Sequence, residues 1–141
     1  ESLLLERVRV AEEAWPEGHW RVGSAAGALV EFYVRYRQPG KALPHAHHQL
    51  SSYEATLGPG HGWTAGAQSL VGVCLLAMDR FAEAEPYLLE GHERLAGLLG
   101  PDHAQAQSMA QRLVNLYERW DRPARAEHFR SMLVDRPGGG M

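Results

Sequence analysis

The stretch LVGVCLLAMDRFAEAEPYLLEGHERL, residues 70–95, decides the fold. Leucine, alanine and glutamate dominate it, strand-like alternation is absent, and one break falls at Asp79-Arg80. Ala84 follows the break, where a small side chain lets a second helix cross the first at close range. The stretch therefore predicts two antiparallel helices joined by a short turn.

This two-helix unit recurs at a constant spacing of 42 residues. The sequences PEGH (16–19), GPGH (58–61) and GPDH (100–103) precede successive first helices, and no gap is needed between them. The register superposes three sets of apolar or small residues: Leu29, Val71 and Leu113; Tyr33, Leu75 and Tyr117; and Ala42, Ala84 and Ala126. Self-similarity at this period is typical of helical repeat arrays, in which each unit packs on its neighbours.

The register predicts an all-α fold of stacked, antiparallel helix pairs. We expect helices at 21–37, 39–57, 63–78, 80–97, 104–120 and 122–134, with Asp102 able to cap the fifth and Pro123 in the first turn of the sixth.

We expect one domain over residues 1–135. It begins with a lone helix at 1–15, which is the second helix of a truncated repeat. Three repeats follow, at 16–57, 58–99 and 100–135. We expect a disordered, glycine-rich tail at 136–141. Residues 1–15 fall on the second helix of a unit in the register, so we expect the chain to be the C-terminal piece of a longer protein.

Composition favours a globular domain and excludes several partners. The 141 residues are 45% hydrophobic and 22% charged, and the formal net charge of −3 is too small and mixed to imply a nucleic-acid or membrane partner. No apolar run approaches the roughly 18 residues of a spanning helix, and the N-terminus lacks the features of a signal peptide. The single cysteine, Cys74, lies in an apolar stretch, which indicates a buried thiol in a reducing compartment. We therefore expect a cytoplasmic protein.

The unit resembles the tetratricopeptide repeat, in its 42-residue, kinesin-light-chain-like form. The resemblance is carried by residues 70–95 and by LVNLYERWDRPARAEHFRSML at 113–133, through the small Gly72, the crossing alanines and Tyr117. The early tryptophan of the family is replaced by Ala26, Gln68 and Ala110. HEAT and armadillo repeats have a similar period and are the alternative, although they do not call for this placement of tyrosine and alanine.

The resemblance implies a right-handed superhelical stack that binds proteins and is not itself an enzyme. The chain looks like the last repeats attached to some bacterial serine/threonine kinases and related signalling proteins. In this family the first helices line a concave groove that holds peptides or partner helices. We expect the groove to be apolar in the middle and polar to either side, formed by Glu31, Arg35, Val73, Leu76, Gln111, Asn115 and Arg119. Self-association through this strip, or packing against another part of the same protein, is the alternative.

Histidines are the residues that most suggest chemistry, because His45, His47 and His48 lie within four positions. At about 100° per residue one helix cannot direct all three at one zinc ion, so we expect surface or interface side chains, with a metal site as a remote alternative. His19, His61 and His103 repeat with the unit, and we expect each to help close the loop before a first helix.

Catalytic and cofactor signatures are absent from the sequence. There is no Gly-x-Ser-x-Gly, His-Glu-x-x-His, P-loop or dinucleotide fingerprint, and the glutamates spread along helix surfaces rather than forming an acid–base pair. We therefore predict no catalytic residue, cofactor or metal.

Overall fold

A computed structural model describes residues 1–15 and 20–134, with the side chains of 20–24 left out. Over this part of the chain it consists of helices without a strand, and none of these helices is long and apolar enough to cross a bilayer. The helices are α1 (Ser2–Ala14), α2 (Trp20–Arg35), α3 (Pro39–Leu57), α4 (Gly62–Ala77), α5 (Phe81–Leu99), α6 (Ala104–Arg119) and α7 (Pro123–Arg130).

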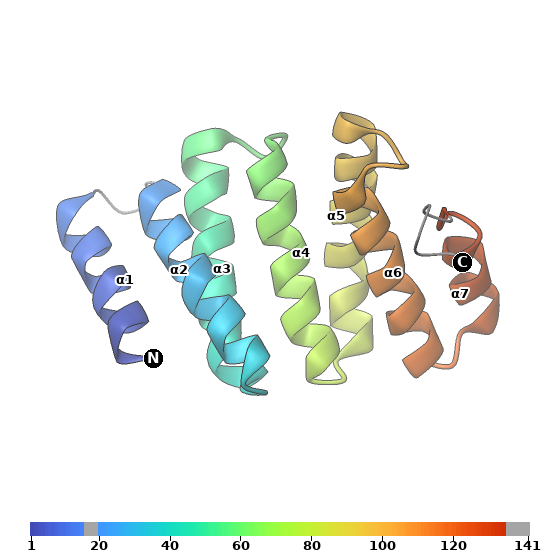
Figure 1. Cartoon of the computed structure of the whole chain (residues 1–141), viewed down its shortest axis with the longest axis horizontal. Coiled ribbons are helices and arrows are strands. Elements are labelled where there is room, and N and C mark those ends of the chain that lie inside the picture. Colours follow the sequence, from blue (N-terminus) through green and yellow to red (C-terminus); the bar gives the residue numbers. More distant parts are fainter. Residues whose placement is uncertain (16–19, 135–141) are drawn as a thin grey trace.

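The helix pairs follow one another in a row, and each helix packs against the next along the chain (Figure 1). The first helices α2, α4 and α6 also approach one another in turn, whereas the described backbones of α3 and α5 do not. A row whose first helices are closer together than its second helices curves, with the first helices on the inner side. The predicted all-α solenoid is confirmed.

Small residues set the distance between the two helices of a pair. Ala42, Ala84 and Ala126 are buried at the predicted crossing positions. A Cβ atom added to Gly72 of α4 would lie 2.7 Å from the Cγ of Leu88 on α5, a side chain with no exposed surface. Close contact at these positions is therefore possible only because the residues are small.

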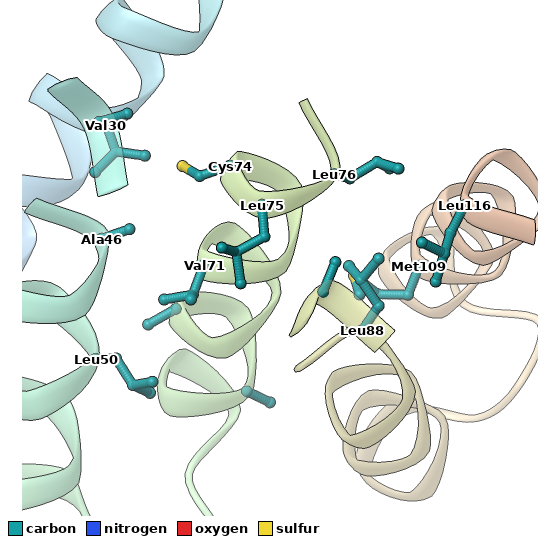
Figure 2. Packing of buried hydrophobic residues seen from close by; sticks show 14 of the residues in the cluster. Val30, Ala46, Leu50, Val71, Cys74, Leu75, Leu76, Leu88, Met109 and Leu116 are labelled. Atoms are coloured by element: carbon teal, nitrogen blue, oxygen red, sulfur yellow. The ribbon is translucent and has the colours of Figure 1, made fainter. Parts of the chain in front are cut away.

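The core is continuous from α1 to α7, because the first helices bury side chains in both directions along the row. In Figure 2, Val71 of α4 lies on the side of α3, near Leu50, while Leu76 points towards α6, where Leu116 lies. Cys74 is fully buried on the α2 and α3 side, as predicted, and burial raises the pKa of its thiol to about 11.

A polar contact between successive units occurs twice, 84 residues apart. The Tyr117 hydroxyl donates to Glu85 Oε2 at 2.8 Å, and Arg125 Nη1 lies 3.1 Å from the same oxygen. The equivalent set of residues consists of Glu1, Tyr33 and Lys41: Lys41 Nζ is 3.9 Å from Glu1 Oε2, and a hydrogen bond with Glu1 raises the pKa of Tyr33. In the middle unit the carboxylate and the tyrosine are both replaced by leucine, at Leu43 and Leu75. The carboxylate and the tyrosine are replaced together, which indicates one interface in two chemical forms.

The turn within each pair has the same backbone in all three units. The residues with positive φ are Arg37 at 59°, Asp79 at 59° and Asp121 at 56°. The amide after each of them returns to a carbonyl five positions earlier, for example from Arg80 N to Leu75 O at 2.9 Å. This pattern of a left-handed residue followed by a backward hydrogen bond is the Schellman motif, and it ends each first helix at the same place.

Histidine caps the first helices, which gives the repeated histidines a structural role. The Nδ1 atom of His61 accepts from Trp63 N at 3.0 Å, and that of His103 accepts from Gln105 N at 3.1 Å. The expectation that Asp102 caps α6 was wrong: the N-cap is His103, since the cap must directly precede the first helical residue. His19, the third of the repeated histidines, lies outside the described residues.

The last helix is shorter than the predicted 122–134, because it ends at Arg130. The side chain of Gln107 on α6 replaces the missing turn: its Nε2 donates to Met132 O and its Oε1 accepts from Val134 N, both at 2.9 Å. These two bonds satisfy backbone groups that a continued helix would otherwise pair. The predicted disordered tail, 136–141, lies outside the described residues.

We predict that Gly72→Ala destabilises the chain and that Gly97→Ala stabilises it. The new methyl at 72 overlaps the buried Leu88, which should lower the free energy of unfolding by about 1–3 kcal/mol. A methyl at 97, also within a helix, meets no atom within 4 Å, so alanine should raise it by roughly 0.5–1 kcal/mol. Urea denaturation of the two variants checks both signs, and equal effects would contradict this description of the packing.

A second prediction concerns the histidine caps. His103→Ala should lower the free energy of unfolding by about 1 kcal/mol, because Gln105 N loses its acceptor, whereas His103→Asn should retain it. Thermal denaturation followed by circular dichroism separates the two variants. An equal loss in both would show that the ring does more than accept this bond.

Candidate functional site

A hollow of about 780 Å³ opens between helices α2 to α6, on the side lined by the first helices. Its apolar surface comes from α3 to α6, through Tyr53, Trp63, Leu70, Leu95, Leu99 and Met109. Its polar surface is contributed chiefly by Glu31, Gln49, Gln105, Ser108 and Arg112. A mainly apolar lining with a few polar groups is the usual composition of a ligand or peptide site.

Small residues on α4 create the space. Gly62, Gly66 and Ala67 line the hollow, and a Cβ on Gly66 would meet no atom within 4 Å. Trp63 and Leu70, on the same helix, border this gap, and Trp63 keeps 53% of its surface exposed while its ring contacts those of Tyr53 and His61. The helix therefore presents large apolar side chains on either side of a space that no other described residue fills.

Gln49 contributes a buried acceptor. The residue is only 7% exposed, and its Oε1 has no hydrogen-bond partner among the described residues. Its amide lies over Gly27 of α2, where an added Cβ would be only 2.1 Å from Nε2. Buried carbonyl oxygens are normally paired, so this atom is an exception among the described residues, and its own burial keeps it from a donor outside the chain.

Arg112 contributes a cation without a carboxylate. It is partly buried, its Nη1 contacts the Met109 sulfur at 3.5 Å, and no ion pair joins it to a described residue. Burial lowers the pKa of its guanidinium, because the charge loses hydration. By contrast, Arg119 and Arg125 are paired with Asp79 and Glu85. The hollow thus contains, on the α6 side, a cation that has no carboxylate partner among the described residues.

The structure brings one of the seven predicted groove residues, Glu31, to this hollow. Val73 is half-buried, and Leu76 keeps only 7% of its surface exposed, so it offers little area to a ligand. Both lie further along α4, towards its C-terminal end. Ligand contact by these residues stays a prediction.

The remaining predicted polar residues are exposed on α2 and α6. Gln111 Nε2 donates to Asn115 Oδ1 at 3.1 Å, Arg119 pairs with Asp79, and Arg35 ends α2. Sequence reasoning missed Trp63, Leu70, Gln105 and Arg112. The 42-residue register could have found two of them, because Leu70 and Arg112 occupy the same repeat position and therefore the same face of α4 and α6.

The three clustered histidines lie on the second helix α3 and contact different neighbours. The His45 ring stacks on Tyr33 at 6.0 Å between centroids, and the His47 ring meets Tyr87 of α5 edge-on at 6.1 Å. Across residues 1–15 and 20–134, no three histidine, cysteine or acidic side chains are grouped so that they could hold a metal. Interface contacts thus account for His45 and His47, and the remote metal alternative receives no support.

Comparison with known proteins bears on the fold. The chain is similar to the crystal structure of BtubC (BKLC) from P. vanneervenii, with a TM-score of 0.73 and 20% sequence identity, and the match covers 79% of this chain. BtubC is a kinesin-light-chain-like tetratricopeptide repeat protein, and the match spans 44% of its length. No protein-family model and no curated protein matches the chain. The likeness shows a helical repeat fold and nothing finer.

His45 makes the stability of this fold sensitive to acid. Burial and the neighbouring His48 lower its pKa in the folded chain, against a smaller opposing effect of Glu12. The unfolded chain then binds the proton more readily, so stability should fall as the pH drops below the ordinary histidine pKa of about 6.5, until the folded pKa is passed. We predict that His45→Gln loses less stability than the wild type between about pH 7.5 and about pH 5. Urea titrations at both values check this, and identical losses would contradict it.

Proposed function

We propose that this chain is a protein-interaction scaffold that binds an extended segment of a partner protein in the hollow between α2 and α6. The observation that carries the proposal is the exposed apolar surface of Trp63 and Leu99 in a hollow that polar residues also line. Apolar contact area supplies affinity to such a site, while the polar groups around it set register and specificity.

The shape and charge of the hollow favour a peptide over other ligands. It is open and crosses three neighbouring first helices, so it suits a long segment better than a compact small molecule. Helix packing forms it in advance, which lowers the ordering cost of binding. The proposal includes no catalytic step, cofactor or metal, and the net charge of −3 gives no support to a nucleic-acid partner.

The cellular setting is proposed from the sequence resemblance. Repeats of this kind resemble those attached to bacterial signalling proteins, and the single buried cysteine suits a reducing cytoplasm. A bacterial, cytoplasmic signalling role is therefore the setting in which we would first look for a partner.

The test is selection of random peptides, displayed on phage, on the purified chain. Peptides enriched on the wild type should bind Leu70→Glu about tenfold more weakly, or weaker still. The reason is that an apolar side chain of the peptide would bury the new carboxylate without a partner, which costs free energy. The matched control is Leu3→Glu, at a leucine that is 86% exposed on α1 and does not line the hollow. Equal loss in both variants, or no enrichment at all, would contradict the proposal.

Self-association is a second candidate, favoured by the surface of α1. Leu3 and Val10 are 86% and 49% exposed, whereas the residues equivalent to them in the repeat, His45 and Ser52, are half-buried and fully buried. A second copy packed on this face would cover it. Sedimentation equilibrium should then detect a dimer that Leu3→Glu abolishes and Leu70→Glu leaves intact, while a monomer at all concentrations would exclude this candidate.

A further inference from the structure

We infer that the end of α7 is a two-state element, in which residues 132–134 either form a non-helical strap that Gln107 pins to α6 or add a further turn to α7. The side chains of Gln107 and Leu133 hold the element in the strap state. The inference goes beyond the proposed function, because neither Gln107 nor the strap lines the hollow.

The local sequence does not require α7 to end at Arg130. Residues 131–134 read SMLV, methionine and leucine are good helix formers, and the next proline is at 137. The backbone nevertheless changes here. Ser131 N donates to a carbonyl four residues earlier, whereas Met132 N and Leu133 N donate to carbonyls only three residues earlier, at 3.1 Å each. A segment whose local preference opposes its conformation is held by tertiary contacts.

Gln107 supplies the tertiary contact with both polar groups of its side chain. The residue is only 6% exposed, and its Nε2 donates to Met132 O and to Pro101 O at 2.9 Å each. Its Oε1 accepts from Val134 N, also at 2.9 Å. One buried amide therefore ties the strap to α6 and to the loop before it, and a fully paired buried amide of this kind fixes a single arrangement.

The middle unit shows why a helix cannot pass these side chains. There the second helix α5 continues, and a Cβ added to Gly91 would lie 3.4 Å from Ser69 Cβ and 3.5 Å from Ala65 O. The 42-residue register places Leu133 at the position of Gly91 and Gln107 at that of Ala65. Both replacements are large where the middle unit is small. A continued α7 would have to fit a leucine into a contact that has room for no more than a methyl group.

The loop before the first helix gives independent support. In the middle unit Arg94, from the part of α5 that α7 lacks, donates to Pro59 O at 2.6 Å. In the last unit the equivalent carbonyl, Pro101 O, receives its hydrogen bond from Gln107 instead. A side chain of the first helix thus takes the place of one from the longer second helix. The strap and the helical turn are therefore alternative solutions for the same region of the unit.

The two states present different surfaces at this end of the molecule. In the strap state Met132 and Val134 keep 37% and 42% of their surface exposed, and Val134 is held against α6. In a helical turn the two side chains would point in nearly opposite directions around the axis of α7. A change of state would therefore move apolar surface without unfolding the repeats.

The experiment compares the full chain with variants by NMR. Backbone carbon chemical shifts of residues 131–134 report helix, and hydrogen exchange of the Val134 amide reports the pinning contact. The double variant Gln107→Ala/Leu133→Ala has alanine at both positions, as at Ala65, and a methyl group fits the contact seen at Gly91. Its helical shifts should extend beyond Arg130 to the end of the strap.

The single variants separate the two contributions. Gln107→Ala leaves Leu133 in place, so the Val134 amide should exchange about five- to tenfold faster without gaining helical shifts. Gln107→Met, which keeps the length of the side chain, should give the same result if the alanine variant folds poorly. Leu133→Ala retains Gln107 and should keep the strap. Gln105→Ala, at another glutamine of α6, is the matched control and should change neither readout.

Four results would overturn the inference. Helical shifts through Val134 in the wild type would show that the strap is not the resting state. A double variant without added helix would show that the second state does not exist. Helical shifts in Gln107→Ala alone would remove the role of Leu133, and unchanged Val134 exchange in both Gln107→Ala and Gln107→Met would remove that of Gln107.

Discussion

Close contact between the two helices of a pair is the constraint on which the rest of the structure depends. Gly72 and Leu88 show it most clearly, since the leucine occupies the space that a Cβ would need. Each pair can then stack on the next with buried alanines at 42, 84 and 126, and the Schellman turns fix where each first helix ends. The row of helices curves because its first helices approach one another more closely than its second helices do.

The same constraint produces the hollow and its polar groups. In the first unit the small residue of one close contact is Gly27, on the first helix, and its partner is the long Gln49. At the equivalent contact of the second unit the order is reversed, because Gly91 lies opposite Ser69, with 3.4 Å between an added Cβ and the serine Cβ. The exchange places a buried amide beside α4, where Gly66 has left space. The buried amide in the lining thus results from which helix of each pair carries the small residue.

Much of the fold could be predicted from sequence, because helix length, turns and crossing positions are local and repeat every 42 residues. The register superposes Tyr33, Leu75 and Tyr117, and this periodicity alone predicts the all-α solenoid. The hollow could not be predicted in the same way. The hollow depends on residues that differ between units, such as Gly66 and Arg112, whereas the repeat register identifies only the residues that the units share. Helix face alone predicts seven groove residues, and of these Glu31 lies in the hollow. The early end of α7 depends on Gln107, a tertiary contact without a local signal.

The most direct measurement is a crystal structure of the chain with a bound, selected peptide. We predict an extended segment that crosses α4 within the hollow, with its apolar side chains over Trp63 and Leu70. A peptide bound on the outer surface of α3 and α5, with the hollow left empty, would contradict this prediction.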